Sequence, residues 1–154
     1  TIYSALMNGS YKENSTIDTS PGKMKVGAHE IEDYVDLGLL DLKGIIAKSS
    51  NIGAAKIMLS LPAQNYWDLL TRLGFGHRTA SGFPGEVPGI LVPRTTWYPS
   101  VVATLAYGYG IAVTTLQLAH AYQILADGGI MMPVSFLKLK TIMGKNYTEI
   151  EFLD

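Results

Sequence analysis

The sequence contains no cysteine and little charge. Without cysteine, it has no disulfide framework and no thiolate metal site. Charged residues make up 16% of the 154 residues, against the usual quarter, and apolar residues make up 47%. This balance favours a large buried fraction in one domain or one large part of a domain. The formal net charge of −1 leaves no basic stripe to neutralise phosphates, which argues against a nucleic-acid partner.

One long stretch, residues 95–126, contains no Asp, Glu, Lys or Arg. A membrane-spanning helix needs about 20 mostly apolar residues. This stretch instead carries Pro99, the two central glycines Gly108 and Gly110, and polar residues such as Gln117. It therefore predicts a buried loop that leads into a buried helix, not a membrane span.

Apolar residues at helical spacing predict four or five helices. The first is the tail of a helix over residues 1–9, and the second covers residues 37–48 with Asp41 near its start. Ser49 or Ser50 caps the third helix. The fourth begins near Pro62 and ends at Gly74, and the fifth follows the capping-box pair Thr114 and Gln117. The expected inward faces are Ile52, Ala55 and Leu59; Tyr66, Leu69, Leu70 and Leu73; and Leu118, Ala121, Tyr122 and Leu125.

The remaining segments predict short strands and loops. Residues 23–26 read as a short strand and residues 29–36 as a solvated acidic connection. Residues 74–100 form a long loop rich in Gly and Pro, a kind of loop that is usually functional or folded on itself. The segment 133–143 has a strand-like pattern. The expected fold class is therefore mainly α, with short β hairpin or strand pieces.

No metal site or cofactor site is predicted from the sequence. The histidines His29, His77 and His120 lie far apart, and none has a second ligand at helical spacing. Neither Gly74-Phe75-Gly76 nor Gly108-Tyr109-Gly110 continues as the G-x-G-x-x-G pattern of a dinucleotide loop.

The tripeptide Ser49-Ser50-Asn51 stands where the third helix begins. By itself, an S-x-N pattern is a weak signal, and a plain helix N-cap worth about 1 kcal/mol explains it. The same pattern at a helix start also presents side chains to a cleft, and penicillin-recognising enzymes combine such a motif with S-x-x-K and K-T-G. The helix cap and the cleft-facing motif are compatible with each other, so both interpretations stay open.

Three segments carry a resemblance to a known family: KSSNIGAAK, LGFGHRTASGFPGEVPGILVPRTTW and TLAYGYGIAVTTLQLAHAYQILADGGIMMP. They resemble the middle of a division-specific class B penicillin-binding protein, the septal peptidoglycan D,D-transpeptidase. The resemblance runs from SALMNG to about Leu139. It implies that residues 1–154 are part of a transpeptidase domain, comprising the helical subdomain of the α/β serine β-lactamase/D,D-peptidase-like fold and the start of its sheet region.

The resemblance also implies roles for individual residues. Ser49 would relay a proton between the active-site lysine and the leaving amine, and Asn51 would hydrogen-bond an amide of the substrate. Tyr107 and Tyr109 would line the cleft wall, although core aromatics explain them equally well. The implied ligands are the D-Ala-D-Ala stem peptide of peptidoglycan and β-lactams. The implied partners are division proteins such as a septal glycosyltransferase. The implied location is the periplasmic side of the inner membrane, to which an anchor outside this chain would tether the parent protein.

The resemblance places the S-x-x-K nucleophile motif just before Thr1 and K-T-G beyond Asp154. The internal match Ser20–Lys23 contains a helix-breaking Pro-Gly, and Ser135–Lys138 lies in a strand-like pattern. Lys140-Thr141-Ile142 has isoleucine where K-T-G needs glycine. The chain alone is therefore expected to be inactive toward penicillin. Two other functions stay open: a non-catalytic helical interaction module and a serine β-lactamase-type hydrolase.

Overall fold

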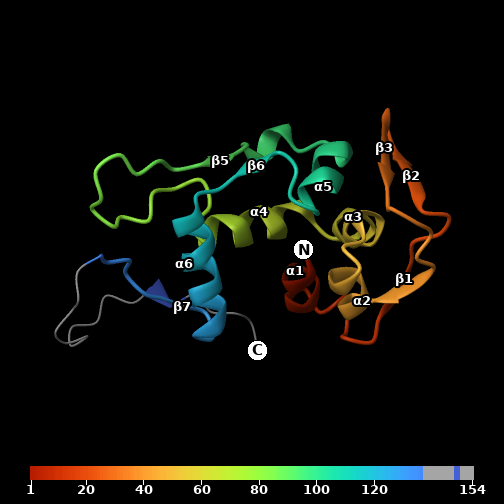
Figure 1. Ribbon diagram of the computed structural model, residues 1–154, viewed down its shortest axis with the longest axis horizontal. Coiled ribbons are helices and arrows are strands. Elements are labelled where there is room, and N and C mark those ends of the chain that lie inside the picture. Colours follow the sequence, from red (N-terminus) through yellow and green to blue (C-terminus); the bar gives the residue numbers. More distant parts are fainter. Residues whose placement is uncertain (137–147, 150–154) are drawn as a thin grey trace. The chain divides into compact units, whose positions relative to one another are not determined.

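The structure is a computed structural model, and it describes residues 1–136 and 148–149 (Figure 1). In this part of the chain, helices hold more residues than strands, as the sequence predicts. The helices, including one short 3-10 turn η1, are α1 (Ile2–Met7), α2 (Leu42–Ala47), α3 (Asn51–Ser60), α4 (Ala63–Arg72), η1 (Arg94–Thr96), α5 (Pro99–Leu105) and α6 (Thr115–Ala126).

The strands pair two by two, and all of these pairs are antiparallel. The pairs are β1 (Thr16–Asp18) with β4 (Leu39–Asp41), β2 (Lys23–Val26) with β3 (His29–Glu32), β5 (Ile90–Leu91) with β6 (Ile111–Ala112), and β7 (Ile130–Met131) with β8 (Thr148–Glu149). The predicted strand at 23–26 is confirmed. Part of the strand-like segment 133–143 lies outside the described residues.

The chain divides into two compact units. The first unit comprises residues 1–67 and 92–110, and the second comprises residues 68–91 and 111–154. The first unit is built around α3, which contacts α1, α2 and α5 as well as β1 and β3 (Figure 1). This unit holds all four residues that the sequence singles out as a site.

Small residues allow the neighbours of α3 to approach it closely. Gly53 faces α2, and a Cβ atom there would lie 2.7 Å from Cγ1 of Ile45. Ile52, Ala55, Ile57 and Met58 are fully buried along the helix. The predicted inward positions Ile52 and Ala55 are confirmed, but Leu59 is 39% exposed because the buried face turns through positions 57 and 58 instead.

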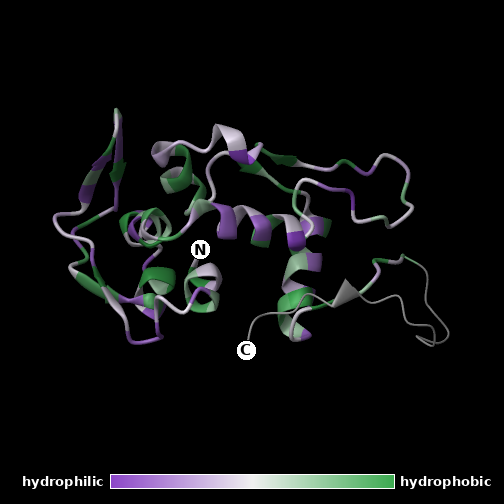
Figure 2. Ribbon diagram, turned by 180° about the vertical axis from the view of Figure 1, so that it is seen from behind, coloured by the Kyte–Doolittle hydropathy of each residue, from purple (hydrophilic) through white to green (hydrophobic). Residues whose placement is uncertain are grey.

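The core of the first unit includes Ile31 from β3, Ile52 and Ala55 from α3, and Ala103 from α5. Ile31 corrects the prediction that residues 29–36 form a solvated connection. Residues 29–32 are a strand whose polar side chains point outward while Ile31 is 3% exposed. The hairpin of β2 and β3 accordingly shows hydrophilic and hydrophobic residues side by side (Figure 2).

The second unit is organised by the first turn of α6. Thr114 and Gln117 form the predicted capping box, with each side chain bonded to the other residue's backbone N–H. Gln117 is 1% exposed, and its Nε2 also donates to the carbonyl oxygens of His77 and Pro88, both at 2.7 Å. One buried amide therefore fixes both ends of the loop at residues 77–88.

The helix face is predicted correctly in α4 and only partly in α6, where Ala121 is buried as predicted. Tyr66, Leu69, Leu70 and Leu73 are each 7% exposed. On α6, by contrast, Leu118 is 44% exposed and Tyr122 is 67% exposed. The buried positions of α6 are Gln117, Ala121 and Ile124. The polar cap residue turns inward because it binds the loop, and this rotates the buried face away from the purely apolar stripe.

A short helix, α5, also lies where the sequence analysis expects only a loop leading into a helix. Pro99 begins it, in the first-turn position where a missing N–H costs nothing. The long connection after Gly74 therefore ends at residue 98 and is partly ordered by β5 and η1.

We predict that Gln117→Ala lowers the free energy of unfolding by roughly 1–3 kcal/mol, because it leaves the part-buried carbonyl oxygens of His77 and Pro88 without their donor. Urea unfolding measures this change. The matched control on the same helix is Gln123→Ala, whose bond to the carbonyl of Ile130 is solvent-exposed. An equal loss in both variants would contradict the role assigned to Gln117.

Candidate functional site

The turn between α2 and α3 is made by Ser49 in a left-handed conformation. Its φ is +53°, an angle that only a few per cent of residues other than glycine adopt. The N–H groups of Ser49 and Ser50 donate back to the carbonyl oxygens of Ile46 and Ile45, at 3.1 and 3.0 Å. The side chain of Ser49 is exposed. The chain thus reverses direction at a serine whose hydroxyl faces outward.

Ser50, and not Ser49, is the cap of α3. It is 2% exposed, and its Oγ accepts the N–H of Gly53 at 2.9 Å. The same hydroxyl donates to Oδ2 of Asp33 at 2.6 Å. The two serines therefore have different environments: one is buried in the helix start, and the other is exposed beside it.

Asp33 completes the helix start and is the residue that the sequence analysis missed. Its Oδ1 accepts the backbone N–H groups of Asn51 and Ile52, at 2.6 and 3.1 Å. A carboxylate is favoured at a helix N-terminus because the N–H groups there carry partial positive charge. No local sequence pattern predicts this contact, since Asp33 lies 17 residues before Ser50, in a segment that the sequence predicts to be a solvated connection.

Asn51 is half-buried, and its side chain leans on the end of β3. Its Nδ2 donates to the carbonyl oxygen of Glu32 at 3.0 Å. Within residues 1–136 and 148–149, no group donates to its Oδ1. The carboxamide is therefore held at one nitrogen and keeps an oxygen that can accept a hydrogen bond from a ligand.

The two predicted tyrosines lie in the same unit and differ in burial. Tyr107 is half-buried and packs against the core that includes Ile52, the residue after Asn51. Tyr109 is 74% exposed, and the two rings meet edge to face at 6.2 Å. Burial, and secondly the neighbouring Tyr109, raises the pKa of Tyr107. Tyr107 thus acts partly as a core aromatic, while Tyr109 is free to contact a ligand.

The internal S-x-x-K match at Ser20–Lys23 does not lie on a helix. Lys23 begins β2, and its Nζ lies 2.6 Å from Glu32 and 3.6 Å from Glu30 in exposed ion pairs. The rejection of this match is confirmed. The other match, Ser135–Lys138, is only partly described, and Lys140-Thr141-Ile142 lies outside the described residues.

The described residues contain no group of three His, Asp or Glu side chains placed to hold a metal ion. His120 instead places Nε2 2.8 Å from the carbonyl oxygen of Met132. None of the described helices is long and apolar enough to cross a membrane.

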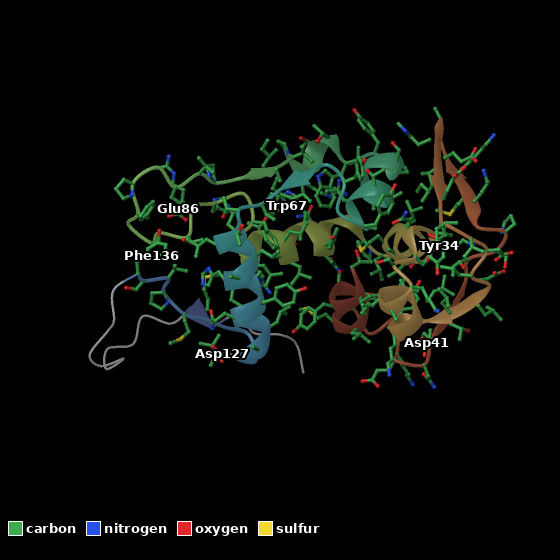
Figure 3. All side chains as sticks on the ribbon, viewed as in Figure 1. Tyr34, Asp41, Trp67, Glu86, Asp127 and Phe136 are labelled. Atoms are coloured by element: carbon green, nitrogen blue, oxygen red, sulfur yellow. The ribbon has the colours of Figure 1, made fainter. Side chains whose placement is uncertain are left out.

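A cavity of about 380 Å³ lies in the loop of the second unit. Its lining is Arg78, Ala80, Gly82, Phe83, Pro84, Gly85 and Glu86. Glu86 ties this loop together, because Oε1 accepts the N–H and the hydroxyl of Thr79 at 2.5 and 2.6 Å (Figure 3 labels Glu86). Its Oε2 accepts the hydroxyl of Ser81 at 2.8 Å. The hydrogen bonds from Thr79, first the side chain and then the backbone, lower the pKa of Glu86.

The family match covers nearly the whole chain. Residues 1–149 match the family described as "Penicillin binding protein transpeptidase domain", and the chain belongs to this family. It is 36% identical over 138 residues to the peptidoglycan D,D-transpeptidase FtsI of Escherichia coli, covering 90% of this chain and 23% of that protein. It is 37% identical over 134 residues to the probable peptidoglycan D,D-transpeptidase PbpC of Pseudomonas aeruginosa, covering 87% of this chain and 24% of that protein.

Solved structures agree with this assignment. The transpeptidase domain of penicillin-binding protein 3 from Burkholderia pseudomallei matches with a TM-score of 0.85 at 36% identity, covering 90% of this chain and 42% of that one. A structure described as a peptidoglycan glycosyltransferase from Burkholderia ambifaria matches with a TM-score of 0.90 at 35% identity, covering 96% of this chain and 47% of that one. The expected fold class, the helical subdomain of a penicillin-binding transpeptidase, is confirmed. The chain spans about a quarter of the length of the curated relatives it matches.

We predict that Glu86→Gln loosens the loop and speeds trypsin cleavage after the exposed Arg78 several-fold at neutral pH. The neutral amide is a weaker acceptor for Thr79 and Ser81 than the carboxylate. Mass spectrometry of the digest measures cleavage at this bond. Glu13→Gln, at an exposed glutamate in the other unit, is the matched control and should leave the rate unchanged.

The wild-type loop should also respond to pH. Because folding lowers the pKa of Glu86 from its ordinary value of 4.5, the stabilisation is complete above that value and is lost as pH falls through the folded pKa. Hydrogen exchange at the Thr79 amide, corrected for the intrinsic rate, should therefore lose protection in acid. Protection that is flat with pH would contradict the contact.

Proposed function

We propose that this chain is part of a D,D-transpeptidase that crosslinks the stem peptides of septal peptidoglycan through a serine acyl-enzyme. Residues 1–154 would supply the helical subdomain and the start of the sheet region of its penicillin-binding domain. The observation that carries the proposal is that the three residues 49–51 have different environments. The middle residue is turned into the helix cap, which leaves the serine hydroxyl before it and the carboxamide oxygen after it available to a substrate.

Each exposed group has a role in acyl transfer. In this reaction a serine oxygen forms an ester with the penultimate D-Ala, and the terminal D-Ala leaves as an amine that needs a proton. The hydroxyl of Ser49 passes that proton from the lysine of S-x-x-K to the leaving nitrogen. Asn51 holds a substrate amide so that the scissile carbonyl faces the nucleophile. Tyr109 contacts the peptide from the cleft wall, and Tyr107 supports it.

The packing of α1 supports a nearby nucleophile. This helix contacts α3, whose first residue is Asn51. If S-x-x-K lies upstream on the same helix, as the family resemblance implies, then serine, lysine and the exposed groups of the turn share one unit. We further propose that the parent protein works at the periplasmic face of the inner membrane, accepts β-lactams as stem-peptide mimics, and acts beside a septal glycosyltransferase.

We predict that Ser49→Ala, made in the full-length protein, slows acylation by a fluorescent penicillin on the order of 100-fold, because the proton relay is lost. Asn51→Asp should slow it as well, since a carboxylate cannot donate to the Glu32 carbonyl that holds this side chain in place. Alanine tolerates the left-handed turn no worse than serine, so the melting temperature should change little. Stopped-flow labelling and thermal unfolding measure the two effects separately.

Two controls sharpen this test. Ser10→Ala, at another exposed serine of the same unit, should leave acylation unchanged. Ser49→Gly removes the hydroxyl while relieving the left-handed strain, so it should abolish the relay without lowering stability. A loss of stability that matches the loss of acylation in every variant would favour a purely structural turn and contradict the proposal.

We also predict that the chain of 154 residues, expressed alone, is not labelled covalently by penicillin. Lys23, three residues after Ser20, lies on a strand, so Ser20 lacks the helical lysine partner that activates the nucleophile, and Ser135–Lys138 has a strand-like sequence pattern. Gel fluorescence after denaturation measures this, with the full-length protein as the positive control. A label that survives denaturation on the isolated chain would show that the nucleophile lies within it.

A further inference from the structure

Three consecutive N–H groups begin α3, and two side chains accept all of them. Asp33 Oδ1 accepts from Asn51 and Ile52, and Ser50 Oγ accepts from Gly53. The remaining oxygen of Asp33 accepts the proton of the Ser50 hydroxyl at 2.6 Å. The carboxylate is therefore bonded to the residue after the exposed serine and to the backbone of the half-buried asparagine.

Asp33 is itself fixed in place by the hairpin. Its own N–H donates to the carbonyl oxygen of Gly22 at 3.0 Å, and it follows directly on β3, which pairs with β2 along its whole length. The preceding residue, Glu32, accepts the side-chain amide of Asn51. The end of β3 thus holds Asn51 twice, once by its backbone and once by its side chain.

We propose that Asp33 is a positioning residue for the acyl-transfer site, and that it aims Ser49 and Asn51 by clamping the backbone between them. This inference rests on the proposed function of those two residues. Ser49 sits in a left-handed conformation that is unfavourable for an L-residue, so the turn needs support from its neighbours. The charge-assisted bonds of Asp33 supply that support on the side of α3.

Acylation kinetics can distinguish a positioning role of Asp33 from a purely structural one. Reactive groups displaced by about 1 Å lose roughly 100-fold in rate even when the protein stays folded. If Asp33 positions the site, Asp33→Ala should slow the first-order rate constant of acylation at saturating penicillin about 10- to 100-fold. If Asp33 only stabilises the fold, its loss should reduce the labelled amplitude or the melting temperature while the rate constant of the folded molecules stays the same.

The experiment is stopped-flow acylation of the full-length protein with a fluorescent penicillin, recording rate constant and amplitude for each variant. The matched control is Asp41→Ala, since Asp41 caps α2 through one bond from Oδ1 to the N–H of Gly44 at 2.6 Å (Figure 3). It removes a helix cap of the same chemistry without touching residues 49–52. We expect a slowed rate constant with Asp33→Ala and an unchanged one with Asp41→Ala.

A second variant guards against failure to fold. Asp33→Asn keeps an oxygen for the N–H groups of Asn51 and Ile52 but replaces the acceptor of the Ser50 hydroxyl with a donor. It should fold and show a smaller slowing. In a double-mutant cycle, Asp33→Ala should add little in the background of Ser49→Ala combined with Asn51→Asp, because it acts through those groups.

The possible outcomes separate this proposal from the proposed function. An unchanged rate constant in both Asp33 variants, or equal slowing by Asp33→Ala and Asp41→Ala, overturns the positioning role while Ser49 and Asn51 keep theirs. Full acylation rates in Ser49→Ala and Asn51→Asp overturn the proposed roles of those residues and the positioning role together. Slowing by Asp33→Ala that simply adds to theirs also contradicts the clamp.

Discussion

The structure of the first unit depends on how the N–H groups at the start of α3 are satisfied. A helix leaves its first N–H groups without partners inside the helix, and burying them unpaired costs free energy. Here a carboxylate from the end of β3 and a hydroxyl from Ser50 accept the first three. Because one acceptor belongs to the hairpin and the other to the helix, the same bonds that begin α3 also join it to β2 and β3. The position of the exposed Ser49 and the half-buried Asn51 follows from this junction.

The packing of the buried side chains of α3 also constrains where residues 49 and 51 lie. Fully buried residues on several sides of the helix, Ile52, Ala55 and Ile57 among them, mean that α3 is a central element and not a surface helix. Gly53 allows α2 to approach within a distance that a Cβ would forbid. The short helix α2 must therefore end close to the start of α3, and the chain between them has room only for a tight turn. The exposure of Ser49 is a consequence of this packing, since both flanking helices use their inward faces for the core.

The parts of the fold that depend on local chemistry are predictable from the sequence, and those that depend on distant partners are not. The serine cap at position 49 or 50, the capping box of Thr114 and Gln117 and the inward face of α4 are all decided within one or two helical turns. Asp33 could not be recognised, because its partners lie in a helix that only the hairpin brings near. The buried face of α6 was misjudged for a related reason. Hydrophobicity favours Leu118 and Tyr122, but the carbonyls of a loop far away in sequence draw the polar Gln117 inward.

The left-handed turn at Ser49 shows why geometry and chemistry must be argued together. Among the described residues, glycine occupies every other position with positive φ except Ala80. Ala80 shows that a strained backbone alone is no sign of a site, since its side chain has no chemistry to offer. Ser49 differs in two respects: its neighbour already supplies the helix cap, and its hydroxyl has no hydrogen-bond partner in the part of the chain that the structure describes. Glycine would make the same turn at lower cost. A hydroxyl that neither caps nor supports the backbone, held beside a clamped carboxamide, is what the proposed proton relay requires.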